Sequence, residues 1–386
     1  MSVLNNCSKI NKGILSLSYL TGFLQIMAMK KIRVLGIESS CDETSVSVVE
    51  KAGDKIKVLS NIVKSQLDVH KDYGGVVPEL AARAHSDVIH KLIKMALDRA
   101  KITFRSIHAI ASTAGPGLLG GLLVGVVAGK TLASSLNKPF IAVNHLEGHA
   151  LSIKLEQKIE FPYLLLLVSG GHTEFTVIKK FNSYKRIGTT IDDALGEAFD
   201  KTARLLKMEY PGGPEIEKYA KEGDENKYKL PLPLINEKNC HFSFAGLKSA
   251  VANVAAQNKC TEKFKKDMSA SFQKTINTIL STKAQHAIEH FQNINKSKDI
   301  TKIVVAGGVA ANKSLRSALR KLESTHQCEF LFPSIKYCTD NGAMIALAGI
   351  ERFERNMFNK LDFKPKPRWP LDKDALFMKG KRIVGE

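Results

Sequence analysis

The sequence lacks the patterns that mark disulfide-rich and membrane-spanning chains. Its 386 residues include six cysteines, but no two of them form a CxxC pair or stand at disulfide-like spacing. A scattered set of this kind favours a reducing compartment. The longest apolar run, 117–129, is shorter than the ~20 residues that a membrane-spanning helix needs, and Lys130 closes it. We therefore expect no membrane as a partner.

Acidic residues are scarce relative to basic ones. Lys and Arg number 57 against 38 Asp and Glu, which gives a formal net charge of +19. A surplus of this size attracts polyanions at long range, so nucleic acid is the leading class of partner. The alternative is a Lys-rich composition with no polyanion to bind.

Length and apolar content predict more than one folding unit. The chain of 386 residues exceeds the ~100–200 residues of a typical domain, and 44% of its residues are hydrophobic. We expect two domains or two lobes around a cleft. Residues 1–29 are predicted to be an extension: a wrongly chosen start, a disordered segment or an organelle presequence, against which the missing Arg argues.

A strand, a polar turn and a second strand occur twice along the chain. The two copies span residues 31–50 and 163–179, and their turns fall at 39–44 and 169–173. Hydroxyls and N–H groups in such turns can bind phosphate oxygens, although ordinary hairpin turns use the same residues. The repeat predicts two related lobes that face one nucleotide.

Helices and further strands are expected after each hairpin. Helical patterns cover 81–100, 118–136, 191–207 and 264–291, and short strands are expected at 109–113, 139–143 and 303–305. Gly121, Gly125 and Gly129 are predicted to let a buried helix approach a sheet. A glycine turn at 210–214 and an extended strap at 364–371 complete the expected layout.

Two histidines form the clearest candidate metal site. His145 and His149 are four residues apart, so on a helix both imidazoles project from one face. Histidines in a core or a helix cap are the commoner explanation of such a pair. Glu147 lies about 200° around the helix from His145, which makes the segment a poor metallopeptidase motif, because the glutamate of HExxH must reach the metal-bound water.

Acidic and basic residues recur on several predicted helices. Asp193, Glu197 and Asp200 form an acidic stripe that is either a solvated face or places Asp200 against a ribose. The basic stripes are either solvated faces or phosphate contacts. The candidate phosphate-binding residues among them are Arg83, Lys91, Lys313, Arg316 and Arg320.

Nine short segments, in order, resemble one family of enzymes. They begin with the GIESSCDET, GGVVPE, TAGPG, NHLEGH and LVSGGHT segments and continue with PGGP, FSFAGLK, AGGV and CTDNGA. Together they resemble the universal tRNA threonylcarbamoyladenosine transferases, in a bacterial form, from about residue 31 to about residue 370. That family was once described as a glycoprotease.

The resemblance implies an α/β fold with two lobes, like those of actin, sugar kinases and Hsp70, and a nucleotide in the cleft between the lobes. We expect the first lobe at 30–145, the second lobe, with the metal and nucleotide sites, at 146–370, and a tail at 371–386.

Site residues are carried over by position. His145, His149 and Asp340 would ligate one divalent metal, Fe²⁺ or Zn²⁺. Asp42 and Glu43 match an acidic pair tied to activity. The remaining positions would bind the donor substrate, threonylcarbamoyl-adenylate: Leu167, Val168, Ser169, Gly170 and Gly171 at its phosphate and acyl end, and Asp200, Gly213, Glu217 and Asn312 at its adenosine end.

The implied reaction moves the threonylcarbamoyl group to the exocyclic amine of the adenosine 3′ of the anticodon, in tRNAs that read codons beginning with adenine, and releases AMP. The implied partners are the tRNA anticodon loop, a small inactive paralogue and an ATPase, or a second copy of the chain. The cytoplasm is expected, with the mitochondrial matrix as the alternative. Competing functions are a small-molecule kinase, a chaperone-like ATPase and a metallopeptidase.

Overall fold

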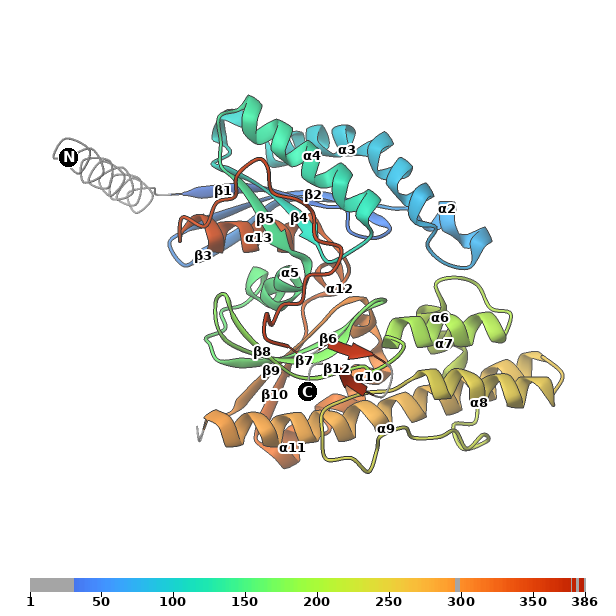
Figure 1. Ribbon diagram of the computed structural model, residues 1–386. Coiled ribbons are helices and arrows are strands. Elements are labelled where there is room, and N and C mark those ends of the chain that lie inside the picture. The colour runs from blue at the N-terminus through green and yellow to red at the C-terminus, as the bar shows by residue number, and fades with distance from the viewer. Residues whose placement is uncertain (1–30, 296–298, 376, 380–381, 385–386) are drawn as a thin grey trace, which may run out of the picture.

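Two five-stranded sheets form the framework of the chain (Figure 1). The computed structural model describes residues 31–295, 299–375, 377–379 and 382–384. The predicted extension at 1–29 lies outside the described residues.

The first sheet has the order β3-β2-β1-β4-β5. Strands β1 to β3 are antiparallel neighbours, whereas β4 is parallel to β1, and β5 is parallel to β4. The strands are β1 (Ile32–Glu38), β2 (Glu43–Ala52), β3 (Lys55–Ser65), β4 (Ala109–Gly115) and β5 (Phe140–Asn144).

The second sheet repeats this order as β8-β7-β6-β9-β10, with the same senses of pairing. Its strands are β6 (Tyr163–Val168), β7 (Thr173–Lys180), β8 (Ser183–Thr189), β9 (Thr301–Ala306) and β10 (Cys328–Leu331). The repeat predicted from the two hairpins is therefore confirmed. The third strand of each copy, β3 and β8, was not predicted, because both are half-exposed edge strands that carry lysines and little alternation.

The helices cover both faces of each sheet, and those expected at 81–100, 118–136 and 264–291 are present. In the first lobe they are α2 (Leu67–His70), η1 (Lys71–Tyr73), α3 (Pro78–Ala100), η2 (Phe104–Ser106), α4 (Leu119–Ser135) and, from the end of the chain, α13 (Gly342–Phe353). In the second they are α6 (Leu195–Leu205), α7 (Gly212–Ala220), α8 (Ala245–Ala256), α9 (Glu262–Asn295), η4 (Gly308–Ala311), α10 (Lys313–Arg320), α11 (Glu323–His326) and α12 (Ile335–Cys338).

Alternate residues of β1 face different helices. Leu35 and Ile37 belong to the core that contains α3 and α4, whereas Ile32 and Val34 pack with α13. Between the two sheets, α13 packs against α5 (His145–Leu151), which is followed by η3 (Ser152–Leu155), and α5 contributes to the core on one face of the second sheet (Figure 1). The two lobes thus meet at two short helices.

The glycines of α4 face inwards, as predicted. A Cβ atom on Gly125 would collide with Ser39, and one on Gly129 would collide with Ser112. These glycines allow the helix axis to lie close to the first sheet. The opposite face of α4 exposes large apolar side chains at intervals of four residues: Leu119, Leu123 and Val127.

Two predicted boundaries in the second lobe are wrong. The helix expected at 191–207 begins only at Leu195, so Asp193 precedes it. Asp192 is engaged elsewhere, since its carboxylate accepts hydrogen bonds from the N–H groups of Phe244 and Ala245 at the start of α8. The turn expected at 210–214 contains the first residues of α7, because that helix starts at Gly212.

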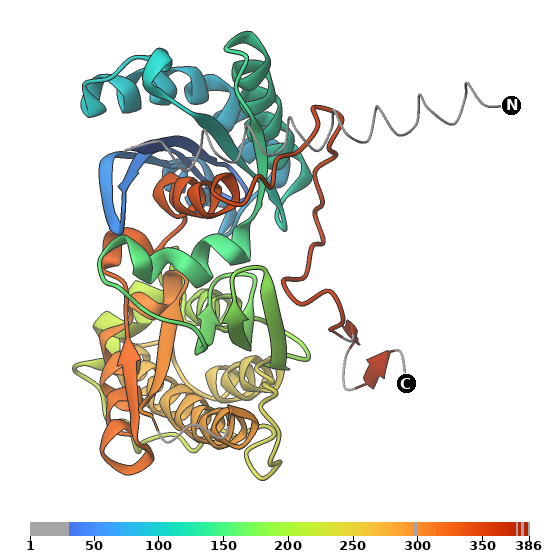
Figure 2. The same ribbon diagram turned by 90° about the vertical axis from the view of Figure 1, so that its left-hand side faces the viewer.

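The chain returns from the first lobe to the second through an extended strap, as Figure 2 shows. The N–H of Lys366 donates to Ala114 O, and the Asn144 side chain donates to Trp369 O. Further along, Asp372 accepts a hydrogen bond from the N–H of Arg186 in β8. A short hairpin of β11 (Phe377–Lys379) and β12 (Arg382–Val384) follows.

The predicted lobe boundaries at 30–145, 146–370 and 371–386 remain predictions. By sequence, α13 lies in the second predicted lobe, but it packs on the first sheet. Within the described ranges, no helix is long and apolar enough to cross a membrane.

The close contact between β1 and α13 generates a stability prediction. A Cβ atom on Gly36 would lie 2.5 Å from Ala346 N and closer still to Gly342 O. Both are backbone atoms that cannot move aside, so Gly36→Ala should lower the free energy of unfolding by on the order of 1–3 kcal/mol. Thermal denaturation measures the change.

Gly246→Ala is the matched control. Gly246 is exposed on α8, and the nearest atom to an added Cβ is Pro233 Cγ at 3.9 Å. This change should leave stability the same or raise it by up to about 1 kcal/mol. Equal melting temperatures for wild type and Gly36→Ala would contradict the packing described.

Candidate metal centre and substrate site

Helix α5 presents both predicted histidine ligands. It starts directly after β5, and the side chain of Asn144 caps it by accepting a hydrogen bond from the N–H of Leu146 at 2.9 Å. His145 and His149 are one turn apart, and both are buried. The prediction that both imidazoles project from one face of a helix is confirmed.

Asp340 meets the two imidazoles from a distant part of the chain. Its Oδ1 lies 3.0 Å from Nε2 of His149 and 3.4 Å from Nε2 of His145. Each residue offers one ligand atom, and these three atoms lie within 4.8 Å of one another. Two imidazoles and a carboxylate are a donor set that suits zinc or iron and leaves coordination positions open, so these residues fit a divalent metal.

Glu38, at the end of β1, orients His145. Its Oε2 accepts hydrogen bonds from Nδ1 of His145 at 3.0 Å and from the Thr113 hydroxyl at 2.6 Å. A carboxylate at Nδ1 directs Nε2 towards Asp340, as is usual behind a metal-ligating histidine. By contrast, Nδ1 of His149 is buried without a hydrogen-bond partner in the described part of the chain.

Sequence reasoning missed Glu38, although it lies in the GIESSCDET segment. The available signal was an acidic residue at the end of a strand whose last four residues before it are apolar, next to a polar turn.

The protonation of the cluster follows from its mixed charges. Burial lowers the pKa of His145, but the carboxylates of Asp340 and Glu38 outweigh this effect and hold that pKa well above its ordinary value. Burial raises the pKa of Asp340, but His145 and His149 outweigh it and lower that pKa. A cation is therefore favoured between the carboxylates.

Glu147 points away from the cluster, as the helical spacing predicts. Arg352 of α13 donates to both of its carboxylate oxygens, at 2.7 and 2.9 Å, and the hydroxyl of Tyr184 in β8 donates to Oε2 at 2.8 Å. The Glu147 side chain is 1% exposed. Its carboxylate ties α5 to both lobes and cannot serve a water at the metal.

Asp42 is the last residue of the turn after β1, and Glu43 is the first residue of β2. Burial raises the pKa of Glu43 well above its usual range, and the charges of Asp340 and Asp42 add to this effect. The turn is fixed by His85 of α3, which contacts Cys41 O through Nε2 and the Thr44 hydroxyl through Nδ1. The acidic pair thus lies within electrostatic reach of the metal cluster.

The predicted phosphate and acyl segment forms the end of β6 and the turn after it. Leu167 and Val168 are buried in the sheet. Ser169 accepts a hydrogen bond from the N–H of His172 at 3.1 Å, and Gly170 and Gly171 face open space where a Cβ would stand. The open backbone of these two glycines allows a ligand to approach closely.

His172 was not among the predicted site residues, although it belongs to the same turn. Burial lowers its pKa to about 4, and the positive potential of His145 and His149 contributes. A neutral imidazole therefore stands near the metal cluster.

The four predicted adenosine-site residues are linked through neighbouring helices. Asp200 of α6 accepts a hydrogen bond from the N–H of Gly212 at 2.8 Å, and Gly213 faces open space. Glu217 of α7 accepts from the N–H of Lys313 at 2.8 Å, directly after Asn312. Asn312 caps α10 through Leu315 N and donates to Gln273. The structure therefore brings these residues together.

The predicted tRNA-binding residues divide between two surfaces. Arg83 and Lys91 lie on α3, against the first sheet, whereas Lys313, Arg316 and Arg320 lie on α10 of the second lobe. Arg83 is exposed and paired with Glu79 at 3.0 Å. The structure does not join the two groups into one patch.

Comparison with known proteins identifies close relatives. The model of the family described as tRNA N6-adenosine threonylcarbamoyltransferase matches residues 57–347. A protein of that name from Pelagibacter ubique is 56% identical over 352 residues, which cover 91% of this chain and 98% of the relative. One from Rickettsia rickettsii is 49% identical over 342 residues, covering 88% and 98%.

Solved structures share the fold at low sequence identity. HypF from T. kodakarensis matches with a TM-score of 0.57 and 14% identity, over 85% of this chain and 48% of that chain. Full-length HypF in its phosphate- and nucleotide-bound form gives 0.53 and 15%, over 85% and 47%. The predicted two-lobed α/β fold of the actin-like class is confirmed.

The ion pair behind the metal helix generates a second stability prediction. Arg352→Leu would leave the Glu147 carboxylate buried without its cation, so the free energy of unfolding should fall by about 3–5 kcal/mol. Arg83→Leu is the control, because the Arg83 and Glu79 side chains are 73% and 78% exposed, and an exposed pair contributes below about 1 kcal/mol. Similar losses of melting temperature in both variants would contradict the anchoring role.

Proposed function

This chain belongs to the tRNA N6-adenosine threonylcarbamoyltransferase family, acyltransferases that modify adenosine in tRNA, and we propose how its residues carry out the transfer. The observation that carries the proposal is the convergence of His145, His149 and Asp340 next to an acidic pair and an open glycine turn.

The proposed donor is threonylcarbamoyl-adenylate, a mixed anhydride. The exocyclic N6 amine of the acceptor adenosine attacks the carbamoyl carbon, the bond from that carbon to the phosphate oxygen breaks, and AMP leaves with the bonding electrons. The amine loses one proton. No protein nucleophile is required, which agrees with the high pKa of Cys41, raised by burial and by Asp42.

One divalent ion, Fe²⁺ or Zn²⁺, would be held by His145, His149 and Asp340. When bound, such an ion supplies a Lewis acid for a carbonyl or phosphate oxygen. Glu38 would keep His145 in the orientation that binding requires, through the hydrogen bond to Nδ1.

The acidic pair is proposed to handle the proton that the amine releases. A carboxylate with a raised pKa is a stronger base, and Glu43 has this property because of its burial and its acidic neighbours. Asp42 contributes part of that effect, so the two side chains act as one unit.

The nucleotide part of the donor would lie along the second lobe. Leu167 to Gly171 would contact its phosphate and acyl end, because the open backbone of Gly170 and Gly171 can approach phosphate oxygens. Asp200, Gly213, Glu217 and Asn312 would hold the adenosine end, with Asp200 accepting hydrogen bonds from the ribose.

The proposed acceptor is the adenosine 3′ of the anticodon, in tRNAs that read codons beginning with adenine. A base in the anticodon loop is unpaired, so it can be presented without melting a duplex. The surplus of 57 Lys and Arg over 38 Asp and Glu suits a polyanionic substrate.

The proposed protein partners are a small inactive paralogue and an ATPase, or a second copy of this chain. The exposed stripe of Leu119, Leu123 and Val127 on α4 is the surface we assign to the paralogue. The glycines of α4 are buried against the sheet and cannot serve this contact. The proposed location is the cytoplasm, with the mitochondrial matrix as the alternative.

A kinase or ATPase on this fold would not need the histidine cluster. A metallopeptidase would need Glu147 at the metal, where the bidentate bond to Arg352 prevents it from acting.

Incorporation of labelled threonine into unmodified tRNA tests the proposal. The reaction contains a threonylcarbamoyl-adenylate synthase, bicarbonate and ATP, with the paralogue and the ATPase supplied. Wild type should incorporate label, and His145→Ala should lose it. No incorporation by wild type under these conditions would refute the proposed function.

The pKa of Asp200 generates a pH prediction. Burial raises this pKa to about 6, with a contribution from Asp42. The ionised carboxylate accepts stronger, charge-assisted hydrogen bonds from ribose hydroxyls than the protonated acid does, so affinity for adenosine should be highest well above pH 6 and should decrease as the pH falls through about 6. Calorimetric titration with adenosine measures the change, because adenosine lacks a phosphate that would titrate at about pH 6. Asp200→Asn should remove the pH step; a step that persists in this variant would contradict the assigned role.

A further inference from the structure

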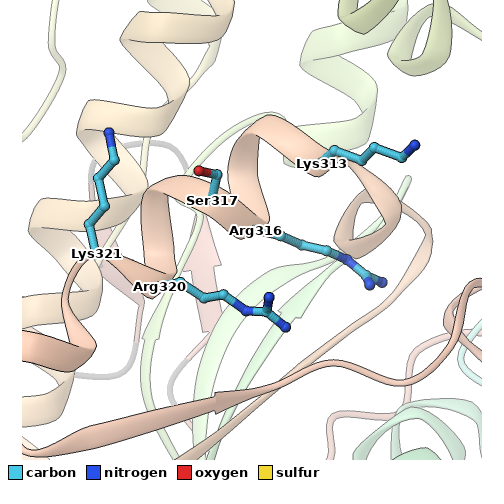
Figure 3. A pocket seen from close by; sticks show the side chains of 5 residues that line it. All are labelled: Lys313, Arg316, Ser317, Arg320 and Lys321. Atoms are coloured by element: carbon cyan, nitrogen blue, oxygen red, sulfur yellow. The ribbon is translucent and has the colours of Figure 1, made fainter.

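Helix α10 carries a hollow lined almost entirely by cations (Figure 3). The hollow has a volume of about 510 Å³, and its lining consists of Lys313, Arg316, Ser317, Arg320 and Lys321. No acidic side chain belongs to this lining. Figure 3 shows Lys313, Arg316 and Arg320 extending from the same side of α10, and Ser317 and Lys321 from another.

The four cations of this hollow differ from the lysines of α9 in their ion pairing. Within the described ranges, none of them forms an ion pair with a carboxylate, whereas Lys residues on α9 do so repeatedly. Lys313, Arg320 and Lys321 are exposed. Like charges held this close repel one another, so an anion at this place would relieve the repulsion.

An aromatic ring fixes two of the guanidinium groups. Arg316 and Arg320 both lie over the ring of Phe332, at 4.9 and 5.5 Å from its centroid. Phe330 stacks beside that ring, at 6.4 Å between centroids. Because the ring already restricts the Arg320 side chain, less conformational entropy is lost when that side chain binds an anion.

Arg316 differs from the other three because its hydrogen bonds are already used. It donates to Ala310 O at 2.6 Å, and to Pro333 O and Cys338 Sγ at 3.2 and 3.3 Å. Cys338 stands two residues before Asp340. Arg316 therefore ties α10 to the segment that carries a predicted metal ligand.

We propose that this hollow binds consecutive backbone phosphates of the RNA substrate through Lys313, Arg320 and Lys321, while Arg316 positions the segment that leads to Asp340. The inference rests on the proposed function, and it adds Lys321 and separates Arg316 from the phosphate contacts. From residue 313 to residue 321, α10 and its C-cap span about 12 Å, which is longer than a single phosphate group.

The chemistry favours a backbone rather than a base. Four of the five lining residues are cations, which commonly bind phosphate oxygens, and the lining has no carboxylate or amide to pair with the amino groups of adenine or cytosine. The hollow is also next to the proposed adenosine site, since the N–H of Lys313 donates to Glu217.

The test compares two double variants that each remove two positive charges. Arg320→Gln with Lys321→Gln alters the hollow. Lys179→Gln with Lys180→Gln is the control, because both lysines are exposed at the end of β7, towards the opposite edge of the sheet from β10. Affinity for unmodified tRNA is measured from low to moderate salt, together with KM and kcat for threonine incorporation.

The hollow variant should reduce the slope of log affinity against log salt by about two, one for each lost contact, and raise KM for tRNA with little change in kcat. The control should match wild type. Arg316→Lys keeps the charge, so it should keep the salt slope but lower kcat.

If the hollow variant binds tRNA with the wild-type slope while wild type remains active, the inference is overturned and the proposed function stands. If wild type incorporates no threonine, the proposed function fails; a salt slope reduced only in the hollow variant would then still show an RNA site on α10.

Discussion

The contact of the Asp340 carboxylate with two imidazoles of α5 is the constraint on which the arrangement of the lobes depends. The histidines follow β5, Asp340 precedes α13, and Glu38 ends β1. These groups are nearly all buried, and a buried charge needs a partner of opposite sign. The three segments must therefore be placed together, and α5 and α13 become the layer between the two sheets. A bound cation would add further attraction between these segments, because it would contact the Asp340 carboxylate and both imidazoles.

The opposite side of α5 is held as firmly as the metal side. Glu147 is bonded to Arg352 from α13 and to Tyr184 from β8, so a helix of seven residues is fixed to both lobes. Short helices have little stability of their own, and tertiary contacts must supply it. In the sequence, Glu147 resembles the catalytic base of a peptidase, but in the structure it holds α5 in place. The two faces of α5 therefore differ in role, since the imidazoles meet Asp340 on one face and Glu147 sets the position of the helix on the other.

Sequence periodicity predicted those features of the fold and the site that depend on residues close together in the chain. The hairpin repeat, the glycine face of α4 and the facing histidines all follow from periodicity, and the structure confirms them. Contacts between distant segments could not be found this way. Asp340 was identified only through resemblance, Glu38 was missed, and the start of α6 was placed too early because Asp192 binds the N-terminus of α8. The edge strands β3 and β8 were missed because one side of each is solvated, so their hydrophobic pattern is weak.

The most direct test of the account is anomalous X-ray diffraction from crystals of the protein loaded with Fe²⁺ or Zn²⁺, recorded at the absorption edge of the metal. The account predicts one strong peak per chain, bonded to Nε2 of His145, Nε2 of His149 and a carboxylate oxygen of Asp340 at about 2.0–2.2 Å. Glu38 should stay at Nδ1 of His145, and Glu147 should stay on Arg352. A metal bound elsewhere, or one that recruits Glu147 in place of Asp340, would contradict the central claim.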